Sequence, residues 1–279
     1  ATDALLAAGG SGIATLGLPG TAGVPEEAVA NTWVLPYNIV PTLDEDVAAV
    51  FVEPVAANMG LVAPAPGFLE GLRAECDRVG ALLVFDEVIT GFRLGTGGAQ
   101  GKYDVRPDLT CFGKVIGGGL PIGAVGGRKD IMENLTPLGS VFHAGTLAGN
   151  PLATAAGLAA LNELTDDVYM ELSARTRHVA SMLRDACSEA NVDAMFPVVG
   201  TLAGMYFGSA LGGKTPTNFQ EACTTSEETY AKVFHALLSA GVALAPGAYE
   251  SLFVGLAHTD EVVAQLAERV AKGLQGIHR

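Results

Sequence analysis

The feature that most constrains this chain is the apolar run Leu82–Phe85, which ends in two acidic residues, Asp86 and Glu87. Such a run is typical of a buried strand, and the acids then lie at its carboxyl end. A second short apolar run leads to Lys114, 28 residues after Asp86, which leaves room for one crossover between neighbouring strands. Ligands of open α/β sheets bind beyond the carboxyl ends of the strands, so Asp86 and Lys114 are the first candidate site residues.

A lysine amine and a carboxylate at adjacent strand ends suit pyridoxal phosphate. The amine can bind the aldehyde carbon of this cofactor, and the carboxylate can keep its pyridine nitrogen protonated. A structural Asp–Lys pair near the surface is an equally good interpretation of these two residues alone.

Longer segments decide between these interpretations because, taken together, they resemble the class III aminotransferases of fold type I. The segments occur in one order along nearly the whole chain: Gly10–Pro19, Glu53–Gly60, Phe85–Arg93, Phe112–Pro121 and Ala144–Pro151.

The resemblance implies an α/β protein with the pyridoxal-phosphate-dependent transferase fold of type I. Its large domain has a mainly parallel sheet with helices on both faces, and a small α/β domain follows at the C-terminus. We expect the large domain at residues 1–167 and the small domain at 168–279. The sequence does not begin with Met, and about the first third of the family chain is expected to be missing from the large domain.

The resemblance also implies roles for single residues. Lys114 is expected to bind pyridoxal 5'-phosphate covalently and to move protons during the reaction. Asp86 is expected to stay ionised beside the ring nitrogen, and Val88 to pack against the ring. Asn58 is expected near the phenolic oxygen of the cofactor, although an asparagine before Met-Gly is also typical of a turn.

Further residues are expected to bind the phosphate, contact the substrate or close the site. Gly145 and Thr146 resemble the segment that reaches the cofactor phosphate of the other subunit, which implies a homodimer with shared active sites. Glu250 is expected to turn toward the substrate, or else to be a plain exposed carboxylate. Ser11 and Gly12 lie in a glycine-rich stretch that resembles a gating loop, for which a surface loop is the alternative.

The chemistry implied is amino transfer with the cofactor in its pyridoxal and pyridoxamine 5'-phosphate forms. The stretch with Ser11 and the segment Glu53–Gly60 favour the aminomutase branch of the family, which moves an amino group within one small amino-aldehyde substrate. A class III transaminase acting between two substrates uses the same lysine, aspartate and threonine. A catalytically incompetent fragment that keeps the fold and the dimer surface is a third possibility.

Composition excludes other classes of function. The net charge of −14 offers no basic stripe for nucleic acid. No apolar run is long enough to cross a membrane. The four cysteines have no Cys-x-x-Cys spacing, so we expect no zinc site, and we expect reduced thiols in a cytoplasmic protein.

Hydrophobic periodicity, together with residues that typically begin or end helices, predicts the remaining elements. We expect a helix at 68–79 ended by Gly80, a buried helix after Pro151, a long amphipathic helix from Val168, a capping box at Thr225–Glu228 and a last helix capped by Thr259. Strands are expected at 32–37, 47–53, 121–127, 203–207, 242–245 and 252–256. The stretch 38–46 is too short for a parallel crossover, so either a helix has been lost there or the strands pair differently.

Overall fold

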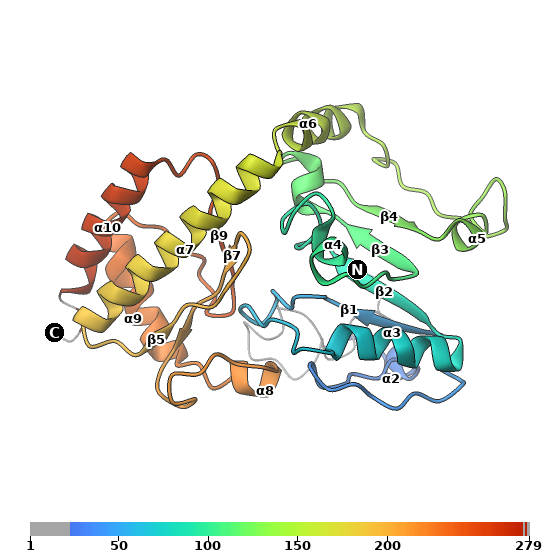
Figure 1. Cartoon of the computed structure of the whole chain (residues 1–279), viewed down its shortest axis with the longest axis horizontal. Helices are drawn as coiled ribbons and strands as arrows, with labels where there is room; N and C mark the ends of the chain where they lie inside the picture. The colour runs from blue at the N-terminus through green and yellow to red at the C-terminus, as the bar shows by residue number, and fades with distance from the viewer. Residues whose placement is uncertain (1–22, 276, 278–279) are drawn as a thin grey trace. The chain divides into compact units, whose positions relative to one another are not determined.

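The computed structural model describes residues 23–275 and 277, which form two compact units (Figure 1). Unit 2 consists of Val40–Val55 and Pro64–Glu171. Unit 1 consists of the described parts of Ala1–Ile39, Ala56–Ala63 and Leu172–Arg279. The predicted residues Ser11 and Gly12 of the gating loop lie outside the described part of the chain.

Unit 2 is built on a four-stranded sheet. The strands are β1 (Ala49–Val52), β2 (Leu82–Glu87), β3 (Leu109–Phe112) and β4 (Ala124–Gly127), in that order across the sheet. The first three strands are parallel and β4 is antiparallel to β3. Because the middle of β2 is buried, it reads as a continuous apolar run. The predicted α/β fold with a mainly parallel sheet is therefore confirmed, and the carboxyl ends of β1, β2 and β3 share one edge.

Helix α3 (Phe68–Val79) makes the crossover from β1 to β2 and matches its predicted bounds. Its buried side chains recur at helical spacing and include Leu69, Leu72 and Cys76. Gly80 ends the helix in a left-handed conformation with φ of 76°, and its N–H donates to the carbonyl oxygen of Cys76. The crossover from β2 to β3 contains the short helix α4 (Gly98–Tyr103).

The elements after β3 continue unit 2. They are the 3₁₀ helix η2 (Lys114–Gly117), strand β4, α5 (Lys129–Met132) and α6 (Pro151–Asn162). Asn150 caps α6 because its side chain accepts hydrogen bonds from the N–H groups of Leu152 and Ala153, and Pro151 stands at the first helical position as predicted.

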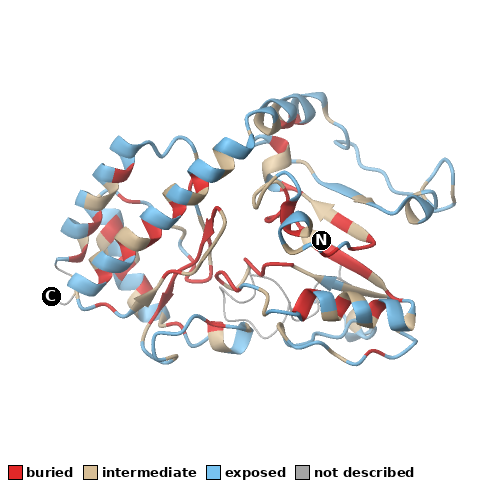
Figure 2. Ribbon diagram, viewed as in Figure 1, coloured by how far each residue is buried: buried red, intermediate tan, exposed pale blue. Residues whose placement is uncertain are grey.

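The prediction that the helix after Pro151 is buried is wrong for the described residues. Only Ala153 and Gly157 of α6 are buried, whereas Leu152 is 72% and Leu158 63% exposed. Figure 2 shows most of this helix in the colour of exposed residues. The helix is apolar all round, which usually indicates a covered helix. In the described part of the chain one side of α6 packs on η2 and the other sides are open.

The predicted strand at 32–37 is also wrong. This segment has no strand in the structure, and Trp33 is 64% exposed. A parallel neighbour of β1 needs a crossover of about a dozen residues or more, and the described residues between Tyr37 and β1 contain no helix. Two alternatives were left open for the stretch 38–46, a lost helix and a different pairing of the strands. Both apply, because the stretch contains no crossover helix and the segment 32–37 does not pair with the sheet.

Unit 1 packs two long helices and short strands against α7 (Asp166–Glu189), the predicted long helix along which the chain passes from unit 2 into unit 1. The other helices are α2 (Glu26–Val29), α8 (Phe219–Ala222), α9 (Glu227–Ser239) and α10 (Asp260–Leu274). The strands are β5 (Ala194–Met195), β6 (Val198–Val199), β7 (Leu202–Ala203), β8 (Tyr206–Phe207) and β9 (Leu252–Phe253). Their common core includes Leu183, Phe207, Tyr230, Leu237 and Val270.

Several predictions about unit 1 need correction. The expected strand at 203–207 is two strands, because β7 pairs with β6 and β9 whereas β8 pairs with β5. The segment 242–245 is not a strand, and the strand at 252–256 is limited to β9. Ser226 caps α9 in place of Thr225, whose hydroxyl accepts a hydrogen bond from the N–H of Phe207. Thr259 caps α10 as predicted.

Candidate active site

Asp86 is the next-to-last residue of β2, which ends at Glu87. It pairs in register with Cys111 of β3, and its Oδ1 accepts a hydrogen bond of 3.0 Å from the N–H of Val88. Burial and, second, the negative charge of Asp86 raise the pKa of the Cys111 thiol. The carboxylate is half-buried, so it stands at the shared edge of the sheet with part of its surface open to a ligand.

Glu87, the second acid of the pair, is fully buried and serves the structure. Its carboxylate accepts hydrogen bonds from the N–H of Ala99 at 2.6 Å, from the Thr90 hydroxyl at 2.9 Å and from the Gln100 side-chain amide at 2.9 Å. A Cβ added at Gly98 would lie 2.4 Å from a Glu87 oxygen. Glu87 therefore fixes the beginning of α4 on the tip of β2, and of the two acids Asp86 is the one left open.

Lys114 directly follows β3 as the first residue of η2. Its side chain is exposed, and its backbone has φ of 48°, a left-handed conformation that is uncommon for a residue with a side chain. A Cβ added at the preceding Gly113 would lie 3.2 Å from Cγ1 of Val88. The exits of β2 and β3 therefore touch, and they bring Asp86, Val88 and Lys114 to the same edge of the sheet.

Helix α6 packs closely against the turn that starts at Lys114. A Cβ added at Gly157 would lie 2.0 Å from the carbonyl oxygen of Ile116, and one added at Gly118 would lie 2.3 Å from that of Ala156. Gly118, one of the three glycines that follow Lys114 within five residues, is therefore required by the close approach of α6.

Gly145 and Thr146 lie in the exposed segment that leads into α6. The carbonyl oxygen of Gly145 accepts a hydrogen bond of 2.9 Å from the N–H of Ala148, which makes a turn just before the helix cap. Because α6 is anchored on η2, this segment is connected through packed structure to the turn of Lys114.

Asn58 and Glu250 belong to unit 1, where two loops bring them into one neighbourhood. The N–H of Gly60 donates to the carbonyl oxygen of Tyr249 at 2.7 Å. The hydroxyl of Ser251 lies within hydrogen-bond distance of the carbonyl oxygens of Ala57 and Gly60. The side chains of Asn58 and Glu250 are both half-buried.

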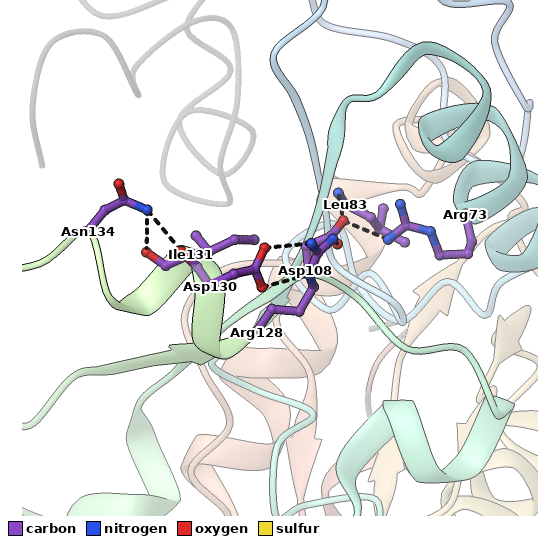
Figure 3. Close-up of polar contacts among 7 residues, drawn as sticks. All are labelled: Arg73, Leu83, Asp108, Arg128, Asp130, Ile131 and Asn134. Atoms are coloured by element: carbon purple, nitrogen blue, oxygen red, sulfur yellow. Dashed lines mark hydrogen bonds and ion pairs between the residues drawn. The ribbon is translucent and has the colours of Figure 1, made fainter. Parts of the chain in front are cut away.

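Asp108, which the sequence reasoning missed, is a buried carboxylate at the opposite end of β3 (Figure 3). Its oxygens accept hydrogen bonds from the N–H of Leu83 at 2.8 Å and from the guanidinium groups of Arg73 at 2.7 Å and Arg128 at 2.8 Å. Burial works against the charge, but these donors outweigh it and hold the pKa of Asp108 below its usual value. The group ties α3, β2 and β4 together at the edge away from Lys114, so its role is structural.

Two further kinds of feature are absent from the described residues. They contain no group of His, Cys, Asp and Glu side chains that could hold a metal ion. None of their helices is long and apolar enough to cross a membrane. An open hollow of about 590 Å³ in unit 1, near Asp193, Ser226 and Lys232, includes none of the predicted site residues.

Comparison with known proteins agrees with this geometry. Residues 25–274 match the family model for class-III aminotransferases. The chain therefore belongs to the class-III aminotransferase family.

Particular members of the family are similar over almost the whole chain. The glutamate-1-semialdehyde 2,1-aminomutase of Desulforapulum autotrophicum is 48% identical over 274 residues, which cover 95% of this chain and 63% of that protein. An omega-transaminase from Sphaerobacter thermophilus superposes with a TM-score of 0.83 at 28% identity, covering 94% of this chain and 61% of its own.

A variant glutamate-1-semialdehyde aminomutase from Pseudomonas aeruginosa PAO1, solved in complex with PMP, gives a TM-score of 0.77 at 26% identity, over 91% of this chain and 59% of its own. The chain thus spans about three fifths of the length of the relatives it matches.

Proposed function

We propose that the chain carries the cofactor-binding part of a pyridoxal-phosphate-dependent aminomutase. The reaction converts (S)-4-amino-5-oxopentanoate, also called glutamate-1-semialdehyde, into 5-aminolevulinate for tetrapyrrole synthesis. The observation that carries the proposal is the placement of Asp86 and Lys114 at touching exits of neighbouring parallel strands. The 48% identity to an aminomutase supports this choice of substrate.

The residues at this edge fit pyridoxal 5'-phosphate. Lys114 is exposed and offers a primary amine, and Asp86 offers a carboxylate on a residue that is only partly buried. Gly113 leaves the strand exit free of a side chain where a Cβ would already touch Val88. When bound, the cofactor supplies an electron-withdrawing ring and, in its pyridoxamine form, an amino group that can be given and recovered.

The residues of unit 2 then have distinct tasks. Lys114 holds the cofactor through its amine and, once released, moves a proton between cofactor and substrate carbons. The Asp86 carboxylate holds a proton on the ring nitrogen, and Val88 packs against the ring. Gly145 and Thr146 bind the phosphate of the partner subunit's cofactor.

The remaining tasks fall to other parts of the chain. For unit 1, the family resemblance assigns the Asn58 amide to the phenolic oxygen of the cofactor and the Glu250 carboxylate to the substrate. Ser11 and Gly12 belong to the loop that closes the site and excludes water. We also propose a large domain at 1–167, a small domain at 168–279 and a cytoplasmic location, which stay predictions from the sequence.

A direct experiment tests the cofactor site before any substrate is added. The chain is incubated with pyridoxal 5'-phosphate, reduced with borohydride and digested, and the labelled peptide is identified by mass spectrometry. We expect the label on Lys114. Label elsewhere, or none, would rule out the proposed site.

A second experiment tests the reaction. The semialdehyde is offered alone, and 5-aminolevulinate is expected without any second keto acid, because isomerisation moves the amino group within one molecule. A strict requirement for an amino acceptor would point to the intermolecular transaminase, which the TM-score of 0.83 with an omega-transaminase supports. Cofactor binding with neither reaction would identify a catalytically incompetent fragment.

We further propose a homodimer with shared sites. Besides the similarity of Thr146 to a residue that reaches across subunits, the support is a set of exposed apolar side chains on residues 138–158. This set, called the apolar face below, consists of Leu138, Val141, Phe142, Leu147, Leu152 and Leu158, all of them exposed. So many large exposed apolar side chains in one segment favour a protein–protein contact.

A further inference from the structure

The loop 56–63 begins four residues after the end of β1, but it belongs to unit 1. Within it the N–H and carbonyl groups of Ala56 and Val62 bond each other in both directions, at 3.0 and 2.8 Å, which closes the loop into a compact turn. Asn58 lies at the tip of this turn. What fixes the tip is a set of contacts from distant parts of unit 1.

Three hydrogen-bonding groups fix the tip around Asn58. The Ser251 hydroxyl lies 3.3 Å from the carbonyl oxygen of Ala57 and 3.2 Å from that of Gly60, so its single proton is shared between them. The N–H of Gly60 donates to Tyr249, and the Tyr206 hydroxyl donates to the carbonyl oxygen of Met59 at 2.9 Å.

These contacts involve the chain neighbours of the two predicted site residues. Asn58 stands between Ala57 and Met59, and Glu250 stands between Tyr249 and Ser251. The bonds therefore tie the backbone on each side of Asn58, and they tie the Glu250 loop to it.

Burial follows the same pattern. Ala57 and Gly60 are buried, as are Tyr249 and Ser251, whereas the side chains of Asn58 and Glu250 are half-exposed. Gly60 has φ of 82°, and a Cβ added there would lie 2.4 Å from the Tyr206 hydroxyl, so only glycine allows this close approach. The two loops thus bury their backbone against each other and leave one amide and one carboxylate at the surface.

We infer that Ser251 is a positioning residue, whose hydroxyl holds the Asn58 loop in register with the Glu250 loop. The bond thereby fixes the backbone that carries the Asn58 amide relative to the backbone that carries the Glu250 carboxylate. This inference rests on the proposed function, because that function gives Asn58 and Glu250 their tasks. Ser251 itself acts through them and touches no reacting atom.

The first test needs no activity. Hydrogen exchange of the peptide that covers 56–62 is measured for the unchanged protein, for Ser251→Ala and for the control Ser209→Ala, an exposed serine of the same unit. One lost hydrogen bond of about 1 kcal/mol predicts about fivefold faster exchange at Gly60 in Ser251→Ala, and no change in the control. Unchanged exchange in Ser251→Ala would overturn the inference whatever the enzyme does.

Tyr206→Phe removes the second side-chain donor and is expected to speed exchange in the same peptide. If both variants speed exchange over the whole chain, the effect is general destabilisation and the inference fails. A restricted effect in both variants supports it.

The second test separates positioning from plain stability. The loss of kcat caused by Ser251→Ala is measured alone and in the Asn58→Ala, Glu250→Gln background. If Ser251 acts through these side chains, the loss is expected to disappear in that background, because coupled sites are not additive. A loss of equal size in both backgrounds would make Ser251 a purely structural residue and overturn the inference. If the unchanged protein is inactive, the proposed function fails, and the exchange experiment alone decides whether Ser251 holds the two loops together.

Discussion

At the scale of single residues, Lys114 is one of five residues other than glycine with a positive φ in the described part of the chain. A left-handed conformation costs a residue with a side chain about 1–2 kcal/mol, and glycine adopts it freely. Lys114 nevertheless occupies this position, at the exit of β3 and beside Val88. Strain of this kind persists where function requires the side chain, which agrees with the task proposed for the amine.

Substitution of Lys114 is expected to separate stability from activity. The free energy of unfolding should be about 1 kcal/mol higher for Lys114→Gly than for Lys114→Ala, because glycine relieves the strain. Both variants should lose amino transfer by about a thousandfold or more. Urea denaturation and turnover assays measure these effects.

The matched control is Lys129→Ala, which removes a lysine that is 88% exposed in the same unit. It should keep cofactor labelling and turnover. Equal activity in Lys114→Ala and Lys129→Ala would contradict the assignment.

Asp86→Asn keeps the shape of the side chain and removes its charge. Because a neutral amide cannot hold the ring nitrogen protonated, kcat is expected to fall by about 10²–10⁴, while borohydride still labels Lys114. Asp104→Asn, in the same unit, is the control. A variant at position 86 with normal kcat would show that the charge is not used.

Asp108 provides a prediction about pH. Its pKa is lowered in the folded protein, so its contribution to stability is complete above the unfolded pKa of about 3.9 and is lost as the pH falls through the folded value. Asp108→Asn breaks a buried ion-pair group and should cost about 3 kcal/mol at pH 7. The difference from the unchanged protein should shrink below about pH 4.

Urea titrations across this pH range check the expectation for Asp108. The control is Asp130→Asn, which removes an exposed partner of the same Arg128 and should change stability little. A difference at Asp108 that does not vary with pH would speak against the charge as its cause.

At the scale of elements, the close contact between α6 and η2 fixes the turn of Lys114. The backbones approach so closely that neither Gly118 nor Gly157 has room for a side chain. This contact links the segment of Gly145 and Thr146 to the exit of β3 through one helix. A disturbance of α6 should therefore reach the cofactor site without touching a site residue.

Gly157→Ala tests this link. Alanine favours a helix over glycine by about 1 kcal/mol, but the new Cβ would lie 2.0 Å from the Ile116 carbonyl oxygen, so stability and cofactor binding should both fall. Gly101→Ala is the control. Gly101 lies in α4 with open space at its Cβ position, so this variant should be slightly more stable than the unchanged protein. If both substitutions stabilise the protein equally, the proposed link between α6 and the turn of Lys114 is contradicted.

Elements also show what could be predicted from sequence. The end of β2, the bounds of α3 and the cap of α10 are set by local signals at Asp86, Gly80 and Thr259, and they were predicted. The segment 32–37 and the exposed sides of α6 were predicted wrongly, because their burial depends on partners distant in sequence. The candidate site divides in the same way: the edge with Asp86 and Lys114 follows from a rule of topology, whereas the bond from Ser251 to Ala57 joins residues 194 positions apart and gives no local signal.

At the scale of the whole molecule, the apolar face on residues 138–158 predicts self-association. The unchanged chain should sediment as a dimer, and Leu152→Glu with Leu158→Glu should sediment as a monomer. Because both side chains are exposed, the double variant should keep the urea midpoint of its fold. Met170→Glu, which alters an exposed apolar residue of α7, should remain dimeric. A monomeric unchanged chain would contradict the proposed assembly.

The loop 56–63 has a consequence for dissecting the protein. Leu61 and Val62 are each only 1% exposed, and a Cβ added at Gly204 would meet Leu61 at 2.7 Å, so this loop fills part of the interior of unit 1. A recombinant fragment beginning at Leu172 would lack this loop and would have an apolar cavity beside Tyr206. Supplying residues 56–63 as a synthetic peptide should therefore raise its melting temperature, much as a ligand does.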